Sequence, residues 1–182
     1  KMIYEHFEKV YLPDIEYIIS CTDEDGEGEH KIFDYIRNND HSNETVSIYG
    51  LDSDLIMLSI CNEKYAKDIY VFREAPNFKS VLSSIFDEKE KLFMDIKQLT
   101  EAITKETNAT PDDYMFMCIF LGNDFLPAFT SLNLRTNGYQ ILMDTYMCTI
   151  GKYENRSLLV DGEIQWKWFQ LFVDKLGKHE DE

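Results

Sequence analysis

Strand-like and helix-like hydrophobic patterns alternate through the first half of the chain. Short runs rich in β-branched and aromatic residues predict strands at residues 15–20, 45–49, 68–73 and, more briefly, 92–96. Apolar residues at helical spacing predict helices at residues 2–11, 29–38, from 55 onwards and from 99 onwards. Because strands that alternate with helices usually build a parallel sheet, we expect an α/β fold with a largely parallel sheet and helices on both faces.

The second half of the chain is predicted to be mainly helical. Thr110 followed by Pro111 is a typical helix start. The residues that follow are apolar on every side, which indicates a buried central helix ending at Gly122. Two further helices are expected at residues 137–150 and 166–176, with a short strand at 158–160.

The composition is typical of one packed domain with an acidic surface. The chain has 182 residues, 44% of them hydrophobic, so it can bury a sizeable core. We expect residues 1–182 to form a single unit, with a variable loop at 77–91 and a loose tail at 178–182. The 34 Asp and Glu residues against 18 Lys and Arg give a net charge of −16. Such a charge excludes a broad basic groove for nucleic acid within this chain, and leaves open whether the acids form a solvated coat or hold cations.

The cysteines, apolar runs, histidines and aromatic residues limit the expected location of the protein and the kinds of site it can contain. No C-x-x-C pair is present, and each cysteine lies in an apolar stretch, so we expect buried, reduced thiols in an intracellular protein. The longest apolar run, residues 114–121, is too short to cross a membrane. The four histidines form no spaced set of ligands. Aromatic residues at 166–172 are expected in the core rather than stacked on bases.

Five carboxylates follow the ends of predicted strands or helices: Glu27, Glu29, Asp52, Asp54 and Asp124. Asp52 and Asp54 come directly after a strand, where residues two apart point the same way. In a regular helix Glu27 and Glu29 would point about 200° apart. Both can therefore reach one site only if Gly26 and Gly28 keep Glu27 in the loop before the helix.

Carboxylates in this arrangement suit a hard cation. Mg²⁺ takes oxygen ligands, and two such ions roughly 3.5–4 Å apart can activate a water and stabilise the leaving oxygen of a phosphodiester. The spacing alone leaves four interpretations open. These are helix caps and solvated loops without chemistry, metal-dependent phosphoryl transfer, a glycosyltransferase-like D-x-D motif at Asp52 and Asp54, and an acidic module that binds a protein.

Three blocks of sequence resemble the 5′→3′ exoribonucleases of the Xrn family in order and rough spacing. They are Gly-Glu-Gly-Glu-His-Lys-Ile at residues 26–32, Tyr-Gly-Leu-Asp-Ser-Asp-Leu-Ile at 49–56, and Phe-Met-Cys at 116–118 continuing to Gly-Asn-Asp-Phe-Leu-Pro at 122–127. The resemblance covers roughly residues 15–176. It implies a nuclease core related to the flap-endonuclease and PIN-like fold.

The same resemblance implies the activity and its site. Such enzymes remove nucleotides one at a time from single-stranded RNA bearing a 5′-monophosphate, with two Mg²⁺ or Mn²⁺ ions. It marks Glu29, Asp52, Asp54 and Asp124 as direct metal ligands and catalytic residues, and Glu27 as a ligand acting through water. His30 and Lys31 belong to the motif and are expected to be structural or to support the metal ligands without binding the ions themselves.

The chain also departs from the family pattern. Asp25 stands where proline is common, and Ala128 to Thr130 follow Pro127 where a His-Leu-Pro-like stretch is usual. The half of the nuclease domain that supplies further aspartates and a basic 5′-phosphate pocket has no counterpart here. We therefore expect the second half of a nuclease domain, inactive alone and cytoplasmic or nuclear, with a compactness that suits a viral member of the family. Its expected partners are RNA and the missing half. The alternative is a non-catalytic nuclease fold that binds a protein.

Overall fold

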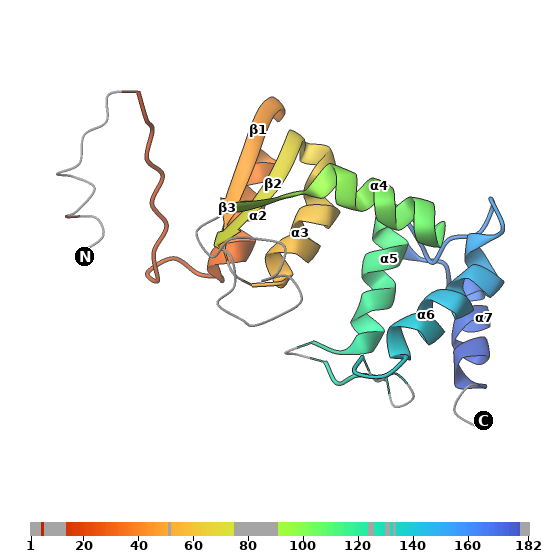
Figure 1. The fold of residues 1–182 in the computed structure, drawn as a ribbon. Coiled ribbons are helices and arrows are strands. Elements are labelled where there is room, and N and C mark those ends of the chain that lie inside the picture. The colour runs from red at the N-terminus through yellow and green to blue at the C-terminus, as the bar shows by residue number, and fades with distance from the viewer. Residues whose placement is uncertain are drawn as a thin grey trace.

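The computed structural model describes residues 5, 14–50, 52–74, 91–123, 126–129, 132 and 134–178. Figure 1 shows the sheet with helices α2 and α3 toward one end of the molecule and helices α6 and α7 toward the other, with α5 between them. The predicted helix at 2–11, most of the variable loop at 77–91 and the end of the tail fall outside the described residues.

The main sheet has the order β1-β2-β3 and is mixed. Strands β1 (His41–Tyr49) and β2 (Ala66–Glu74) are parallel, and β3 (Lys91–Asp95) runs antiparallel to β2. The prediction of a largely parallel sheet is therefore wrong. Helix α3 (Asp54–Asn62), followed by the short helix η1 (Glu63–Tyr65), supplies the crossover that a parallel β1–β2 pair requires. Hydrophobic alternation identifies a strand but carries no information on its direction.

The predicted strand at 15–20 is also wrong. The structure assigns no regular secondary structure to residues 15–21, and Ile15 and Ile18 are exposed. A strand is stabilised by its ladder with a neighbour, so a run of β-forming residues is not sufficient.

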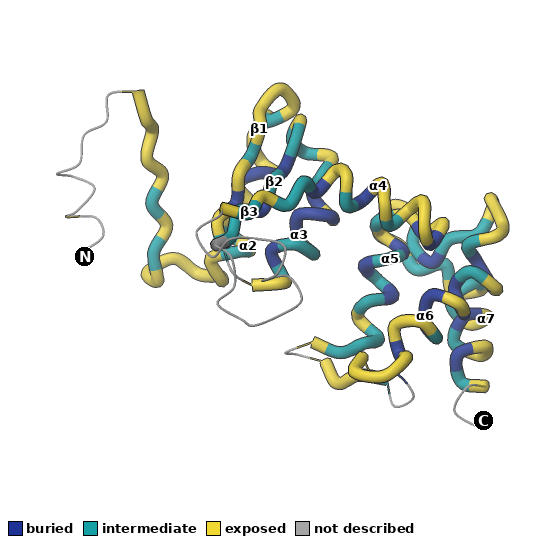
Figure 2. Tube along the Cα trace, viewed as in Figure 1, coloured by how far each residue is buried: buried dark blue, intermediate teal, exposed yellow. Residues whose placement is uncertain are grey.

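Helices cover one face of the sheet in the described part of the chain. Buried residues of α2 (Gly28–Asn38), α3 and α4 (Ile96–Thr107) form a core with Ile48 and Val71 of the sheet, which Figure 2 shows in dark blue. The opposite face carries a row of rings across the three strands, in which Phe72 lies 5.2 Å from Tyr49 and 4.8 Å from Phe93, measured between ring centroids. Among the residues that the structure describes, the predicted helices are thus found on one face of the sheet.

A second core lies in the helical part. It is built by α5 (Pro111–Cys118), α6 (Gly138–Tyr146) and α7 (Trp166–Gly177), with the short 3₁₀ helix η3 (Ile119–Leu121), the π-helix η4 (Met147–Gly151) and the hairpin of β4 (Leu159–Val160) and β5 (Glu163–Ile164). The predicted start of α5 is confirmed, because the Thr110 hydroxyl accepts a hydrogen bond from the backbone N–H of Asp113 at 3.1 Å. Phe172 is buried as expected, whereas Trp166 is exposed.

Asp113 is a buried carboxylate that joins three elements. It accepts hydrogen bonds from the Tyr146 hydroxyl at 2.7 Å, from the Ser157 hydroxyl at 2.8 Å, and from the backbone N–H groups of Leu158 and Leu159 at 2.9 and 2.8 Å. These bonds connect the first turn of α5 to α6 and to the start of β4. Burial and the bond to Asp113 raise the pKa of the Tyr146 phenol above its ordinary value.

Helix α5 belongs to both cores. Met115 packs with the sheet core and Met117 with the helical core, and Tyr114 packs against both. The two cores are therefore joined by a shared helix and not by a flexible linker.

All four cysteines are free, in agreement with the prediction of reduced thiols. Two of them, Cys61 and Cys148, are exposed, so the expectation of burial is wrong for these two. No helix in the described ranges has the length and apolar character needed to cross a bilayer.

Candidate metal centre

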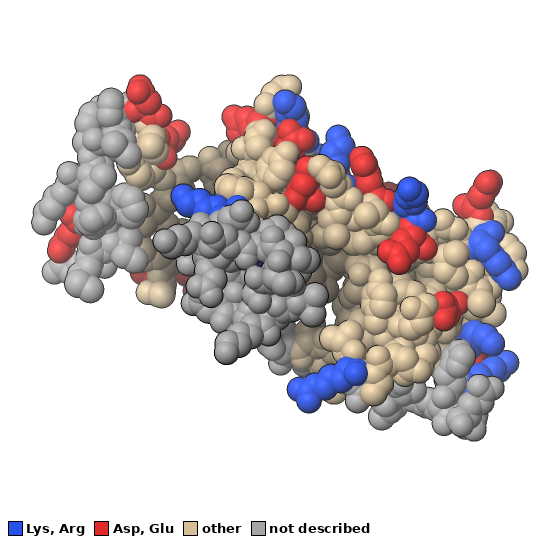
Figure 3. All heavy atoms as spheres, viewed as in Figure 1, with Lys and Arg blue, Asp and Glu red and all other residues tan. Residues whose placement is uncertain are grey.

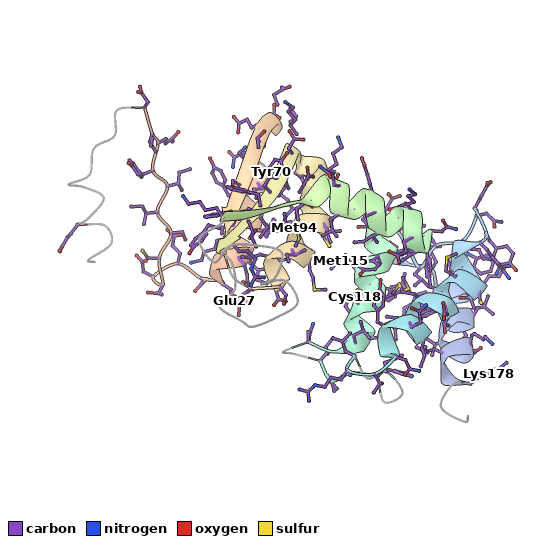
Figure 4. The ribbon with its side chains drawn as sticks, viewed as in Figure 1. Glu27, Tyr70, Met94, Met115, Cys118 and Lys178 are labelled. Carbon is purple, nitrogen blue, oxygen red and sulfur yellow. The ribbon has the colours of Figure 1, made fainter. Side chains whose placement is uncertain are left out.

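Glu27 lies in the loop directly before α2, as the sequence requires if it is to share a site with Glu29. It is the N-cap residue, in an extended conformation with φ −76° and ψ 151°, and the helix begins at Gly28. The turn into this position uses Gly26 at φ +98°, a conformation that favours glycine. The loop and helix together therefore turn the Glu27 side chain toward that of Glu29 in the first helical turn, at the place labelled in Figure 4.

A three-residue cluster forms at this end of α2. One side-chain ligand atom from each of Glu27, Glu29 and His30 lies within 4.8 Å of the others. The His30 Nε2 atom is 4.0 Å from a Glu27 carboxylate oxygen. This position beside the acids is compatible with the expectation that His30 is structural or supports the metal ligands. The i,i+3 spacing from Glu27 was the sequence signal for this contact, since residues three apart share one helix face.

Lys31 has the structural role expected of it. Its ammonium group donates hydrogen bonds to the backbone carbonyls of Cys21 at 2.9 Å and Glu24 at 2.7 Å. These bonds tie the acidic loop to the first turns of α2, so the loop that contains Asp25 is held despite the missing proline.

Asp52 and Asp54 lie where β1 ends and α3 begins. Asp54 is the first residue of α3, and Asp52 is exposed in the turn before it. Gly50 leaves room for the Leu55 side chain, because a Cβ atom there would lie 2.0 Å from a Leu55 methyl carbon. The N-cap residue is Ser53, and its side chain makes no capping hydrogen bond. The cap interpretation of this motif therefore receives no support from the geometry.

The two acidic segments act on each other electrostatically. Partial burial raises the pKa of the Glu29 carboxyl, and the negative charges of Glu27, Asp54 and Asp52 raise it further. His30 opposes this effect. Glu29 and Asp54 also stand in the first turns of α2 and α3, whose helix dipoles favour negative charge. Among the described residues the structure thus brings Glu27 and Glu29 within 4.8 Å of each other, whereas Asp52 and Asp54 act on Glu29 from the start of α3 and are not members of that cluster.

Asp124 lies outside the described residues, but Asn123 and Leu126 on either side of it are hydrogen-bonded to each other. The backbone N–H of Asn123 donates to the carbonyl of Leu126 at 2.9 Å, and the N–H of Leu126 donates to the Asn123 side chain at 2.8 Å. Gly122 has φ +84°, and a Cβ atom there would lie 2.7 Å from the backbone nitrogen of Ala128.

Two of the residues that depart from the family pattern, Ala128 and Phe129, pack against the residues around Gly122. Ala128 lies against Gly122. The ring of Phe129 lies 6.0 Å from that of Phe120, and its N–H donates to the Phe120 carbonyl at 2.8 Å. The departure is thus accommodated by packing, and it gives no independent support to a degenerate, non-catalytic fold.

We predict that Gly122→Ala lowers the free energy of unfolding by at least about 2 kcal/mol, since the new methyl group meets backbone at a positive φ. Gly162→Ala is the matched control. Gly162 also has a positive φ, +81°, but open space around its Cβ direction, so about 1 kcal/mol is expected there. Denaturant unfolding followed by fluorescence measures both. Equal losses would show that the approach of Ala128 does not constrain the turn.

The donor set suits a hard divalent cation. Carboxylate oxygens are the ligands that Mg²⁺ and Mn²⁺ prefer, and an imidazole nitrogen such as that of His30 is accepted more readily by Mn²⁺ than by Mg²⁺. Glu27, Glu29, Asp52 and Asp54 are the described residues that would hold the ions. Bound ions would lower the mutual repulsion that now raises the pKa of Glu29.

Comparison with known proteins finds family matches for two regions of the chain. Residues 2–75 match the family described as XRN 5'-3' exonuclease N-terminus, and residues 104–182 match the one described as Xrn1 helical domain. The first match contains both acidic segments at α2 and α3, and the second contains the turn around residue 124.

Fungal proteins named 5'-3' exoribonuclease 2 are similar over most of the chain. That of Candida glabrata is 30% identical over 199 residues, which cover 91% of this chain and 19% of the relative. The proteins of Kluyveromyces lactis and Saccharomyces cerevisiae are 31% and 29% identical, again over 91% of this chain and 20% of each relative. The chain thus spans about a fifth of the length of these relatives. With both XRN regions matched in order, the chain belongs to the XRN 5'-3' exoribonuclease family.

Proposed function

We propose that this chain forms part of a divalent-metal-dependent 5′→3′ exoribonuclease that hydrolyses single-stranded RNA with a 5′-monophosphate. The observation that carries the proposal is the cluster of Glu27 and Glu29 at the start of α2, where the charges of Asp52 and Asp54 near the start of α3 act on Glu29. Membership of the XRN family supports it. Asp124 is assigned to the same site from the family motif in which it stands.

The proposed site needs its ions, because its own groups are nearly all acidic. Two Mg²⁺ or Mn²⁺ ions would supply an activated water and stabilise the leaving oxygen of the phosphodiester. The carboxylates hold the charge that attracts and positions these ions. His30 is the one described member of the cluster that can carry a positive charge, so it can moderate the repulsion between Glu27 and Glu29.

Substrate binding also requires parts beyond this chain. We propose that the remaining part of the nuclease domain supplies further metal ligands and the basic pocket for the 5′-phosphate, since these 182 residues carry a charge of −16. A cytoplasmic or nuclear location follows as part of the same proposal. The two matched XRN regions favour the exoribonuclease over a sugar-nucleotide transferase that would use Asp52 and Asp54.

The test is a degradation assay with the complete protein that carries this chain. We expect Mg²⁺-dependent release of mononucleotides from 5′-monophosphorylated RNA, with loss of activity in EDTA and slow release from the same RNA bearing a 5′-hydroxyl. A protein-binding module would show neither RNA degradation nor Mn²⁺ binding in a calorimetric titration. That pair of negative results would overturn the proposal.

A further inference from the structure

A group of basic and aromatic side chains gathers on the helical part, away from the candidate metal centre. The guanidinium carbon of Arg156 lies 3.6 Å from the ring centroid of Tyr153 and 4.5 Å from that of Trp168. The ammonium nitrogens of Lys152 and Lys167 lie 5.2 and 4.4 Å from the centroids of Tyr153 and Trp168. We call these five residues the basic aromatic cluster. Cations at such distances are attracted to the ring faces.

Arg156 is held in a fixed orientation. One of its terminal nitrogens donates a hydrogen bond to the backbone carbonyl of Thr149 at 2.7 Å, in the π-helix η4. Stacking on two rings fixes the guanidinium plane as well. Arginine has five N–H donors and this bond uses one. The remaining donors can bind a ligand, and their direction is fixed before the ligand arrives.

The cluster borders a groove of about 420 Å³. Arg156, Lys152 and Tyr153 form one part of its lining, and Asn108 and Thr110 form another. Glu154 also lines it and is the acidic residue of the groove. The lining thus holds one more cation than carboxylate, in a chain whose net charge is −16 and on whose surface acidic and basic side chains lie close together (Figure 3).

The start of α7 adds to this positive character. Its N-cap residue Gln165 makes no side-chain capping bond, and the first turn holds no acidic residue. The first turn instead contains Lys167, although the helix dipole already places partial positive charge there. Among the ion pairs of the described residues, none includes Lys152, Arg156 or Lys167. These cations are thus not neutralised by a carboxylate within 4.0 Å in that part of the chain.

We propose that the basic aromatic cluster and its groove bind the phosphate backbone of single-stranded RNA. An oriented guanidinium, two exposed lysines and aromatic side chains are the combination that holds single strands without reading their sequence. The proposal rests on the proposed function for RNA as the ligand. It adds a second contact with the strand, outside the site of hydrolysis and within a chain that is otherwise acidic.

The test compares two charge-reversed pairs in the complete protein. Lys152→Glu with Lys167→Glu removes two cations of the cluster. Lys64→Glu with Lys67→Glu is the matched control, because both lysines are exposed, Lys64 lies 5.4 Å from the Tyr65 ring, and the change in net charge is the same. Binding of a fluorescent oligouridine is followed by anisotropy in EDTA, where the result is independent of the metal centre.

We expect the cluster variant to raise the Kd for oligouridine about tenfold or more at low salt, and to lessen the slope of log K against log salt by about 1.4, or 0.7 for each lost phosphate contact. The control variant should retain the slope. Equal effects of the two pairs would overturn the proposal, because they would report overall charge. Unchanged RNA binding together with calorimetric binding of inorganic phosphate alone would also overturn it, in favour of a small-anion site.

The outcomes separate this inference from the proposed function. If the proposed function fails, the unmodified protein does not degrade RNA. If only the cluster fails, the protein degrades 5′-monophosphorylated RNA and the cluster variant binds and degrades long strands as well as the control variant does. If the inference holds, the cluster variant shows a raised KM for long RNA with kcat retained.

Discussion

Replacing Asp54 with Asn is expected to slow Mg²⁺-dependent RNA degradation by the complete protein at least about a hundredfold, which corresponds to roughly 2.7 kcal/mol of activation free energy. Asp54 is the first residue of α3, and its charge acts on Glu29. Asparagine keeps the size of the side chain but removes the negative charge that attracts a divalent cation. The loss should therefore appear in metal affinity as well as in rate.

The matched control for this variant is Asp144→Asn. Asp144 is exposed in α6 and accepts a hydrogen bond from Gln140, so its replacement changes the net charge equally at a place remote in sequence from the acidic segments. Single-turnover rates and a calorimetric Mn²⁺ titration measure the two effects. If Asp54→Asn retains the rate and Mn²⁺ affinity of Asp144→Asn, the assignment of the metal centre is wrong.

Replacing Asp113 with Ala is expected to lower the free energy of unfolding by about 3–5 kcal/mol, because a buried charged acceptor is lost and its donors stay buried without a partner. The donors are the hydroxyls of Tyr146 and Ser157 and the N–H groups of Leu158 and Leu159. Urea unfolding followed by circular dichroism measures the change.

Asp112→Ala provides the comparison, since Asp112 stands next to Asp113 in the same first turn of α5. Its charge interacts with the helix dipole, and its loss should cost no more than about 1 kcal/mol. Asp113→Asn retains one acceptor oxygen and should fall between the two. A loss for Asp113→Ala no greater than that for Asp112→Ala would show that the hydrogen bonds of the buried carboxylate do not hold α5 to the hairpin.

The sequence predicted those parts of the site that depend on local backbone geometry. The glycines around Glu27 indicated a loop residue before a helix, and the structure confirms this conformation. Thr110 and Pro111 indicated a helix start, and the capping bond is present. Such features involve residues three or four positions apart, so their chemistry can be read from neighbours in the chain.

Features that depend on distant partners could not be predicted in this way. Asp113 stands in the first turn of a helix whose start the sequence predicted, whereas its burial results from residues 33 to 46 positions later in the chain. The direction of β3 and the absence of a strand at 15–20 likewise depend on which segments meet in space. Hydrophobic alternation describes one strand at a time and contains no information on its neighbours.

The sharing of α5 between two cores has a consequence for any attempt to divide the protein. The family matches leave residues 76–103 unassigned, so a cut in that interval would follow the sequence-defined regions. The N-terminal piece, ending before residue 104, would then lack Met115 and Tyr114, which close the core beneath the sheet. The C-terminal piece would expose those same side chains to water. Each piece would therefore expose part of a hydrophobic core where the chain was cut. The two acidic segments at α2 and α3 would lie on the N-terminal piece, whose sheet core would be incomplete.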